Sequence, residues 1–211
     1  MISLDKYDLI FLDFDGVVKE SVSVKTDAYI ELFRPYGNVV CNKVKNHHVE
    51  NGGMSRFNKI PLYLKWADVD PTITRVNDLC TKFSMIVKNK VINSNWVPGI
   101  QEFLRSNKEN HIFIIVSATP QDEIEEICKS LKVYDFFSKI YGSPAAKTES
   151  IRESIIHHKV NTSSCIMIGD AQADIDAAKD NDIHFIFRKH RENLTLNINT
   201  NIPIIENFNE L

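Results

Sequence analysis

The stretch LIFLDFDGVV, residues 9–18, decides how the rest of this chain is interpreted. Four consecutive apolar residues run directly into Asp13, and a second acid, Asp15, follows two positions later, before Gly16. A short, unbroken apolar run is typical of a strand that is buried on both faces, as in a parallel sheet. The stretch therefore predicts a central strand that ends in two closely spaced carboxylates.

Three further apolar runs repeat this pattern along the chain. They cover residues 112–116, 165–168 and 184–187, and the first two lead into Ser117 and into Gly169-Asp170. Apolar residues at helical spacing lie between the runs. Helices are predicted to begin near these residues: Pro98, Pro120, Thr148 and Ala171. Strand alternating with helix predicts an α/β fold, a Rossmann-like, doubly wound parallel sheet. The last helix is predicted to end at Asn181-Asp182, which tolerate a left-handed turn.

Residues 22–95 break this alternation, because their apolar residues follow helical spacing throughout. One of the predicted helices has Asp70-Pro71 as its cap and first turn. An insertion directly after the first strand lies over the carboxyl ends of the strands, where α/β folds bind ligands. We therefore predict two domains: a core formed by residues 1–21 and 96–211, and a helical lid formed by residues 22–95.

Composition limits the class of protein. The 211 residues are 43% hydrophobic and 25% charged, as expected of a folded globular chain. The net charge of −3 shows none of the basic excess expected of a duplex-binding protein. The apolar runs fall far short of the roughly 20 residues that a membrane-spanning helix needs. Acidic residues, starting with Asp5 and Asp8, stand where a signal peptide would be apolar, so we expect a cytoplasmic protein.

The cysteines are predicted to be reduced, buried thiols rather than disulfides or zinc ligands. They lie far apart, form no CxxC pair and mostly have apolar neighbours. The four are Cys41, Cys80, Cys128 and Cys165.

The predicted sheet brings polar residues to one edge: Asp13, Asp15, Ser117 and Asp170. Several carboxylates in a small space repel one another unless a hard cation lies between them. Two acids from one strand end and one from another suit Mg²⁺, which takes oxygen ligands in octahedral geometry. An aspartate after a strand is often only a turn or cap residue, and for any single position that interpretation is favoured. For all four polar residues at one edge of the sheet, a shared binding site is the favoured interpretation.

Four segments resemble, in order, the motifs of the haloacid dehalogenase (HAD) superfamily. Residues 13–18, DFDGVV, resemble its first motif, DxDGxx, and the run into Ser117 resembles its second. Lys147 resembles the third motif, and residues 169–174, GDAQAD, resemble the fourth, GDxxxD. The resemblance covers about residues 8–188, and the helical insertion resembles the C1 cap of that superfamily.

The resemblance implies a role for each acid. Asp13 would attack phosphorus and form an aspartyl phosphate. Asp13, the backbone carbonyl of Asp15, and Asp170 would hold Mg²⁺, which offsets the repulsion between two anions. Asp174, one helical turn after Asp170, would hold these ligands or Lys147 in place. The Asp15 side chain would protonate the leaving oxygen and later deprotonate the attacking water.

The resemblance also implies a phosphate-binding group. The Ser117 hydroxyl and the Ala118 N–H would hold phosphate oxygens, and Lys147 would offset negative charge. Gly16 lets the backbone turn close to the nucleophile. The dehalogenase and phosphonatase branches lack an acid at the position of Asp15, so its presence implies transfer of a phosphoryl group from oxygen.

Residues 47–56, HHVENGGMSR, resemble the specificity loop of C1-capped phosphatases and β-phosphoglucomutase-like enzymes. Gly52-Gly53 predict a mobile loop, with Ser55 capping the next helix and Arg56 projecting outward. An arginine fork suits a distant phosphate or carboxylate of the substrate, which makes Gly53 and Arg56 candidate specificity residues. A solvated surface arginine is the alternative. His47-His48 could contact the substrate, but the favoured interpretation is that they are ordinary loop residues.

We therefore expect a Mg²⁺-dependent phosphatase of a small phosphorylated metabolite, such as a sugar phosphate or phosphoglycolate. A β-phosphoglucomutase-like phosphomutase would use the same aspartyl phosphate and return the group to another hydroxyl. A non-catalytic binding or regulatory protein is disfavoured because all four motif positions retain their reactive side chains. A phosphatase of nucleic acids is disfavoured by the acidic charge balance. Neither nucleic acid nor membrane is an expected partner, and the expected state is a monomer or weak homodimer.

Overall fold

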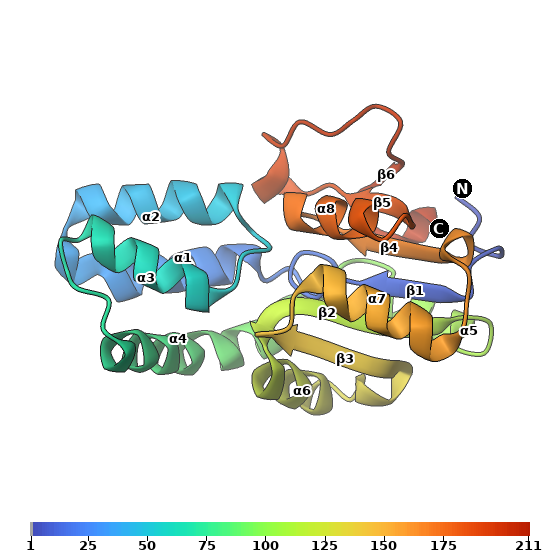
Figure 1. Ribbon diagram of the computed structural model, residues 1–211, viewed down its shortest axis with the longest axis horizontal. Helices are drawn as coiled ribbons and strands as arrows, with labels where there is room; N and C mark the ends of the chain where they lie inside the picture. Colours follow the sequence, from blue (N-terminus) through green and yellow to red (C-terminus); the bar gives the residue numbers. More distant parts are fainter. Residues whose placement is uncertain (1) are drawn as a thin grey trace.

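The computed structural model describes residues 2–211, and these form an α/β fold around a six-stranded parallel sheet (Figure 1). The strands lie in the order β3-β2-β1-β4-β5-β6, so the first strand is central, as its unbroken apolar run predicts. Their bounds are β1 (Leu9–Leu12), β2 (Ile112–Pro120), β3 (Phe137–Ser143), β4 (Cys165–Gly169), β5 (His184–Arg188) and β6 (Ile204–Ile205). The predicted doubly wound sheet is confirmed.

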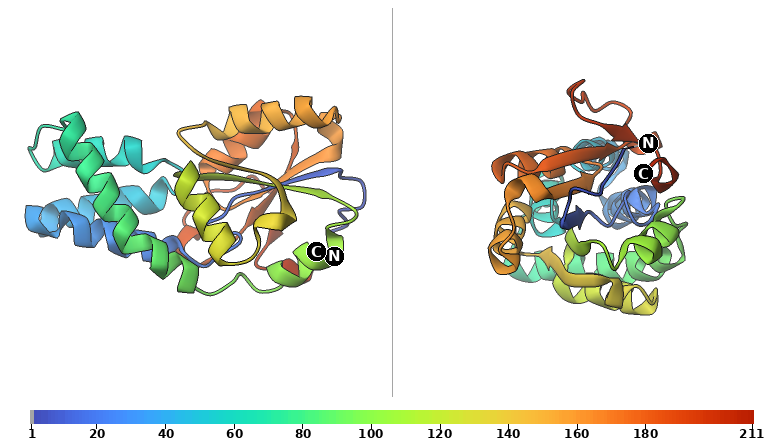
Figure 2. Two further views of the ribbon diagram at one scale, coloured as in Figure 1. Left: turned by 90° about the horizontal axis from the view of Figure 1, so that it is seen from below. Right: turned by 90° about the vertical axis from the view of Figure 1, so that its right-hand side faces the viewer.

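Helices cover both faces of the sheet (Figure 2). Alternate residues of β1 point to opposite faces. Leu9 and Phe11 pack in the hydrophobic cluster that contains α7 (Lys147–His158) and α8 (Gln172–Asp180). Ile10 and Leu12 pack in the larger cluster with α5 (Ile100–Asn107) and α6 (Gln121–Ser130). Both faces of the central strand are therefore excluded from water.

Two strands and one helix start differ from the sequence prediction. The apolar-run criterion missed β3, because its second and third residues are exposed and polar, and β6, because it has only two residues. The helix predicted to include Pro98 in its first turn begins instead at Ile100, after Gly99 adopts a positive φ of 83°. The left-handed turn predicted after α8 is confirmed by Asp182, with φ 53°.

A helical insertion lies between β1 and β2, beyond the carboxyl ends of the strands (Figure 1). It consists of α1 (Val22–Phe33), α2 (Asn38–Glu50), α3 (Arg56–Trp66) and α4 (Ile73–Asn93). Aromatic rings from three of these helices pack edge to face or tilted in its centre: Tyr29, Phe33, Tyr63 and Phe83. The insertion therefore has its own apolar centre and is called the cap below.

Two local predictions for the cap were wrong. The helix predicted to start at Asp70-Pro71 starts at Ile73, because the Thr72 side chain accepts a hydrogen bond from Arg75 N and caps it. His47 and His48 lie in the last turn of α2 rather than in a loop, since this helix continues to Glu50. Among residues 2–211, no helix combines the length and apolarity needed to cross a membrane.

Short 3₁₀ turns complete the chain at Arg34–Tyr36, Tyr134–Phe136, Thr162–Ser164, Arg191–Asn193 and Phe208–Glu210.

All four cysteines are free and buried, as predicted. Burial raises the pKa of the Cys128 thiol to about 12 and that of Cys165 to about 11. Because the thiolate is the reactive form, we expect no native thiol to react with Ellman's reagent at pH 8. The full four should react in 6 M guanidinium chloride. Rapid stoichiometric labelling of the native protein would contradict this burial.

Candidate active site

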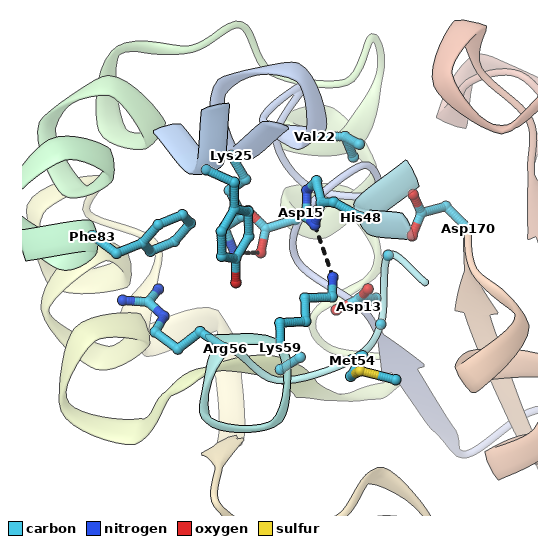
Figure 3. A pocket seen from close by; sticks show the side chains of 14 residues that line it. Asp13, Asp15, Val22, Lys25, His48, Met54, Arg56, Lys59, Phe83 and Asp170 are labelled. Atoms are coloured by element: carbon cyan, nitrogen blue, oxygen red, sulfur yellow. Dashed lines mark hydrogen bonds and ion pairs between the residues drawn. The ribbon is translucent and has the colours of Figure 1, made fainter. Parts of the chain in front are cut away.

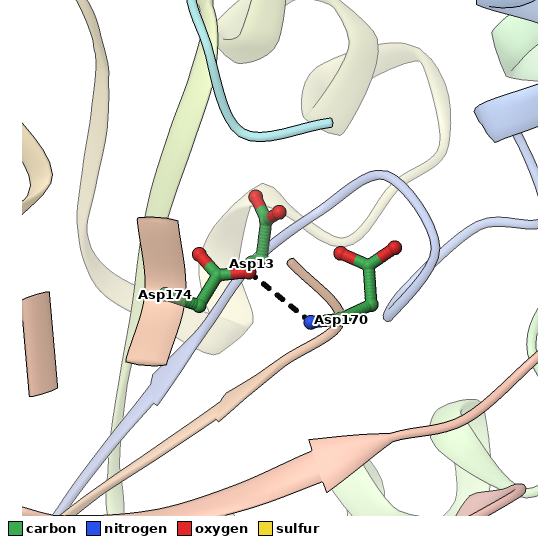
Figure 4. A group of neighbouring side chains, drawn as sticks. All are labelled: Asp13, Asp170 and Asp174. Carbon is green, nitrogen blue, oxygen red and sulfur yellow. Dashed lines mark hydrogen bonds between the residues drawn. The ribbon is translucent and has the colours of Figure 1, made fainter. Parts of the chain in front are cut away.

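Three aspartates meet where β1 and β4 end (Figure 4). The two strands are paired in parallel with Leu12 opposite Ile168, so Asp13 and Asp170 follow neighbouring strand ends. Asp174 reaches the same place from the first turn of α8. Oxygen atoms of the three buried side chains lie within 4.8 Å of one another. The predicted gathering of motif acids at one sheet edge is therefore present.

The loop after β1 passes very close to Asp170. Gly16 has a φ of +80°, and a Cβ at this position would lie 2.2 Å from Asp170 Oδ2. Both the positive φ and this close approach require glycine. Gly16 thereby lets Asp13, Asp15 and Asp170 share one small space.

Lys147 bridges the acids. Its Nζ lies 3.1 Å from Asp13 Oδ2 and 2.6 Å from Asp174 Oδ1. The other oxygen of Asp174 accepts hydrogen bonds from the backbone N–H groups of Asp170 and Ala171, at 3.1 and 3.0 Å. Burial alone would lower the pKa of Lys147. The negative charges of Asp13 and Asp174 outweigh this effect and raise the pKa above its ordinary value, which favours the protonated form. Both Asp174 oxygens are therefore occupied, and its role in holding the ligands or Lys147 in place stays a prediction.

The carboxylates of Asp13 and Asp170 would repel each other if both were ionised. Burial raises the pKa of Asp13 well above its ordinary value, and the negative charges of Asp174, Asp170 and Asp15 oppose the lowering effect of Lys147. Burial also raises the pKa of Asp170. A buried set of hard carboxylate oxygens that disfavours its own ionisation fits a divalent cation. These residues can therefore hold a metal ion.

His190, which sequence analysis missed, contacts this group. Its Nε2 lies 2.7 Å from Asp170 Oδ2, and its Nδ1 lies 2.9 Å from Glu192 Oε2. Burial lowers the pKa of His190, yet the hydrogen bonds and charges of these carboxylates raise it overall. His190 follows β5, which lies beside β4, so its place at a neighbouring strand end was the available signal.

Asp15 faces a different set of partners. Its carboxylate accepts hydrogen bonds from Lys25 Nζ, from Ser21 Oγ at 2.6 Å and from Thr119 Oγ1 at 3.2 Å. Burial raises the pKa of Asp15, but the Lys25 charge and these hydrogen bonds lower it below its ordinary value. Lys25 was not among the residues predicted from the sequence. The helical spacing of Val22, Lys25 and Tyr29 would have placed it on the site-facing side of α1.

The predicted phosphate-binding residues lie at the end of β2. Ser117 is buried, and its hydroxyl accepts a hydrogen bond from Thr119 N at 3.1 Å. Ala118 lines the same cavity as Asp13 and Asp170. The segment is therefore placed beside the nucleophile candidate, and its binding of phosphate stays a prediction.

A cavity lies between the cap and the core (Figure 3). Its lining includes the core acids Asp13, Asp15 and Asp170, and cap residues such as Lys25, His48, Met54, Arg56 and Lys59. The loop with Gly53 closes it from one side, and a Cβ on Gly53 would lie 2.6 Å from Ala173 Cβ. The predicted specificity loop thus packs directly on the helix that carries Asp174.

Arg56 is not a solvated surface residue. Ser55 caps α3 as predicted, but Arg56 is only 4% exposed. Its guanidinium donates to both oxygens of Glu123 on α6, at 2.9 and 2.7 Å, and to Ser84 Oγ at 2.6 Å. It also lies 4.5 Å from the ring centre of Phe83 (Figure 3). A core carboxylate 67 positions away, which no local pattern indicates, holds this arginine inside the cavity.

The chain matches a family model described as haloacid dehalogenase-like hydrolase over residues 9–187. No curated protein matches it. This range contains all four predicted motifs, so the comparison confirms the resemblance found in the sequence.

Solved structures share the fold at low sequence identity. β-Phosphoglucomutase from Clostridium difficile is 21% identical, with a TM-score of 0.78, covering 97% of this chain and 93% of that one. CbbY from Rhodobacter sphaeroides, as a mutant in complex with xylulose-(1,5)bisphosphate, is 14% identical, with a TM-score of 0.80 and coverage of 97% and 96%. A predicted phosphoglycolate phosphatase from Haemophilus somnus is 17% identical, with a TM-score of 0.72 and the same coverage.

Proposed function

Because the chain belongs to the haloacid dehalogenase-like hydrolases, we propose that it is a Mg²⁺-dependent phosphatase of a small phosphorylated metabolite. The observation that carries the proposal is the buried contact of Lys147 with Asp13, beside Asp170. A carboxylate that attacks a phosphate dianion needs positive charge close to it. Lys147 supplies one such charge. Asp13 and Asp170 supply oxygen ligands for a second one, a divalent cation.

Asp13 is the proposed nucleophile. Its Oδ1 accepts a hydrogen bond from Phe14 N at 2.7 Å, and its Oδ2 contacts Lys147, which together fix the carboxylate. Attack on phosphorus would form an aspartyl phosphate and release the alcohol, and water would then hydrolyse that intermediate. Asp13, the Asp15 carbonyl and Asp170 would hold Mg²⁺, which neutralises phosphate charge when bound.

Asp15 is the proposed acid and base. Its lowered pKa suits the second half-reaction, in which an ionised carboxylate takes a proton from water. In the first half-reaction it must donate a proton to the leaving oxygen, which the contact with Lys25 opposes. Lys25 Nζ also contacts Thr119 Oγ1 at 2.7 Å, so it has a second partner. Substrate that draws Lys25 away from Asp15 would raise the pKa of that acid at the point where a proton is needed.

A phosphomutase is the second candidate, and the similarity of the whole chain to β-phosphoglucomutase favours it. The two reactions share Asp13, Asp15 and Lys147 and differ in whether water or a substrate hydroxyl accepts the phosphoryl group. Release of inorganic phosphate separates them.

Metal dependence tests the proposal. We expect wild-type protein with Mg²⁺ to release phosphate from an aryl phosphate and from members of a panel of phosphorylated metabolites. Excess EDTA should lower the rate by about 100-fold or more, since the cation offsets several kcal/mol of charge repulsion. Added Mg²⁺ should restore the rate. Wild-type release no faster than that of Asp13→Asn across the panel would overturn the phosphatase assignment.

A further inference from the structure

The segment that follows β5 touches both loops that carry the proposed metal ligands. It spans residues 188–193 and is called the β5 turn below. Arg188 is 4% exposed, and its Nη1 donates a hydrogen bond at 3.1 Å to the backbone carbonyl of Gly16, in the loop after β1. Asn193 Nδ2 donates one at 2.9 Å to the backbone carbonyl of Asp170, at the end of β4. The β5 turn therefore fixes the backbone on both sides of the group of acids.

His190 is the residue of the β5 turn that contacts a carboxylate of this group. Its side chain is 5% exposed, and its Nε2 lies 2.7 Å from Asp170 Oδ2. An ionised carboxylate only accepts hydrogen bonds, so Nε2 donates in this contact whenever Asp170 is ionised. The other ring nitrogen, Nδ1, lies 3.2 Å from Glu192 N and 2.9 Å from Glu192 Oε2. Glu192 therefore offers Nδ1 a partner whether or not it carries a hydrogen, and the ring orientation does not depend on its charge.

The contacts of the three acids leave one carboxylate oxygen without a partner (Figure 4). Asp174 uses one oxygen for Lys147 and the other for backbone N–H groups. Asp13 uses one oxygen for a backbone N–H and the other for Lys147. Because His190 occupies Asp170 Oδ2, Asp170 Oδ1 is the one oxygen of the three acids that has no hydrogen-bond or ion-pair partner in the described part of the chain. A cation can bind there without displacing an existing contact.

We propose that His190 is a positioning residue of the metal centre, whose Nε2–H holds Asp170 so that its Oδ1 is left for the cation. The inference rests on the proposed Mg²⁺-dependent function and adds to it a residue outside the four predicted motifs. Mg²⁺ requires near-ideal octahedral geometry, whereas Ca²⁺ takes more oxygens and accepts both oxygens of one carboxylate. A carboxylate held with one oxygen available therefore favours Mg²⁺ over Ca²⁺.

Metal binding in the absence of substrate tests the inference. A cation that binds only the folded protein raises the melting temperature, so titrations with MgCl₂ and with CaCl₂ give an affinity for each metal. His190→Phe keeps a ring but removes the N–H, and we expect it to weaken Mg²⁺ binding by about 10- to 100-fold. Ca²⁺ binding should weaken less, because Asp170 is then free to use both oxygens. Unchanged Mg²⁺ binding, or equal losses for the two metals as expected of a merely structural role, would overturn the inference.

Two further variants assign the effect to the hydrogen bond. His190→Gln keeps an N–H donor near the position of Nε2 and should retain more of the Mg²⁺ affinity than His190→Phe. The matched control is His184→Phe, since His184 is exposed at the first residue of β5 and packs on Tyr7, so both affinities should equal those of wild type. Mg²⁺ binding by His190→Gln as weak as that by His190→Phe would overturn the role of the donor.

A measurement on the wild-type protein decides if His190→Phe does not fold. NMR spectra of protein labelled with nitrogen-15 histidine, assigned with His190→Gln, follow the His190 Nε2–H signal. We expect this signal to persist at saturating Mg²⁺, because the hydrogen bond to Asp170 is kept when the cation binds. Its disappearance on addition of Mg²⁺ would overturn the inference.

Failure of this inference is distinguishable from failure of the proposed function, because binding and turnover are separate measurements. Phosphate release by the wild-type protein, together with unchanged metal binding in His190→Phe, refutes only the role of His190. A wild-type melting temperature that does not respond to Mg²⁺ refutes that role whether or not phosphate is released. Absence of phosphate release from every ester in addition refutes both.

Discussion

Replacing Asp13 by Asn is expected to lower kcat/KM for phosphate release by about 10⁴-fold or more. The amide has nearly the shape of the carboxylate but is not a nucleophile toward phosphorus, so no aspartyl phosphate can form. The fold should persist, because Lys147 keeps its contact with Asp174 and the site loses one of its mutually repelling acids. Melting temperature and phosphate release, measured on the same preparation, separate loss of chemistry from loss of fold.

The matched control is Asp5→Asn, at an exposed aspartate outside the cavity, which should retain full activity. Retention of wild-type activity within tenfold by Asp13→Asn would refute covalent catalysis by this residue. Trapping of acid-stable phosphate on wild-type protein, and its absence from the variant, would give an independent measure of the same step.

Glu123→Leu is expected to lower the free energy of unfolding by about 3 kcal/mol or more, because it leaves the buried Arg56 guanidinium without its counter-ion. The pair joins the cap to the core, with both side chains more than nine-tenths buried. Urea unfolding followed by circular dichroism measures the change. Glu126→Leu is the control on the same helix: its partner is Lys88, both side chains are substantially exposed, and we expect a loss below about 1 kcal/mol.

A double variant distinguishes the cost of an unpaired charge from loss of packing. Arg56→Met combined with Glu123→Leu removes both charges. We expect the free energy of unfolding of this double variant to lie within about 1 kcal/mol of the wild-type value, a much smaller loss than the sum of the losses in the two single variants. Additive losses in the double variant would show that the ion pair itself contributes little. A single Glu123→Leu loss below 1 kcal/mol would have the same meaning.

Elements that were predicted correctly show a clear pattern of apolar residues in their own sequence, and the elements that were missed do not. The strands β1, β2 and β4 are almost entirely buried, and β5 is buried from Ile186 onward, so each contains a run of apolar residues. In β3, exposed polar residues interrupt the run, which made the strand indistinguishable from a loop. The end of α2 was missed for a similar reason, since His47-His48 and the glycines after them indicate a loop by composition alone.

The sequence by itself determined which acids meet in the core. Asp13 and Asp170 directly follow apolar runs, and the carboxyl ends of parallel strands gather at one edge of a sheet, so their meeting needs no knowledge of side-chain packing. Only the tertiary structure decided which charges in the cavity are neutralised. Arg56 is paired by Glu123, Lys25 by Asp15, and Lys59 by no carboxylate among residues 2–211. Electrostatic energy depends on distance through space and on burial, and neither is encoded in local spacing along the chain.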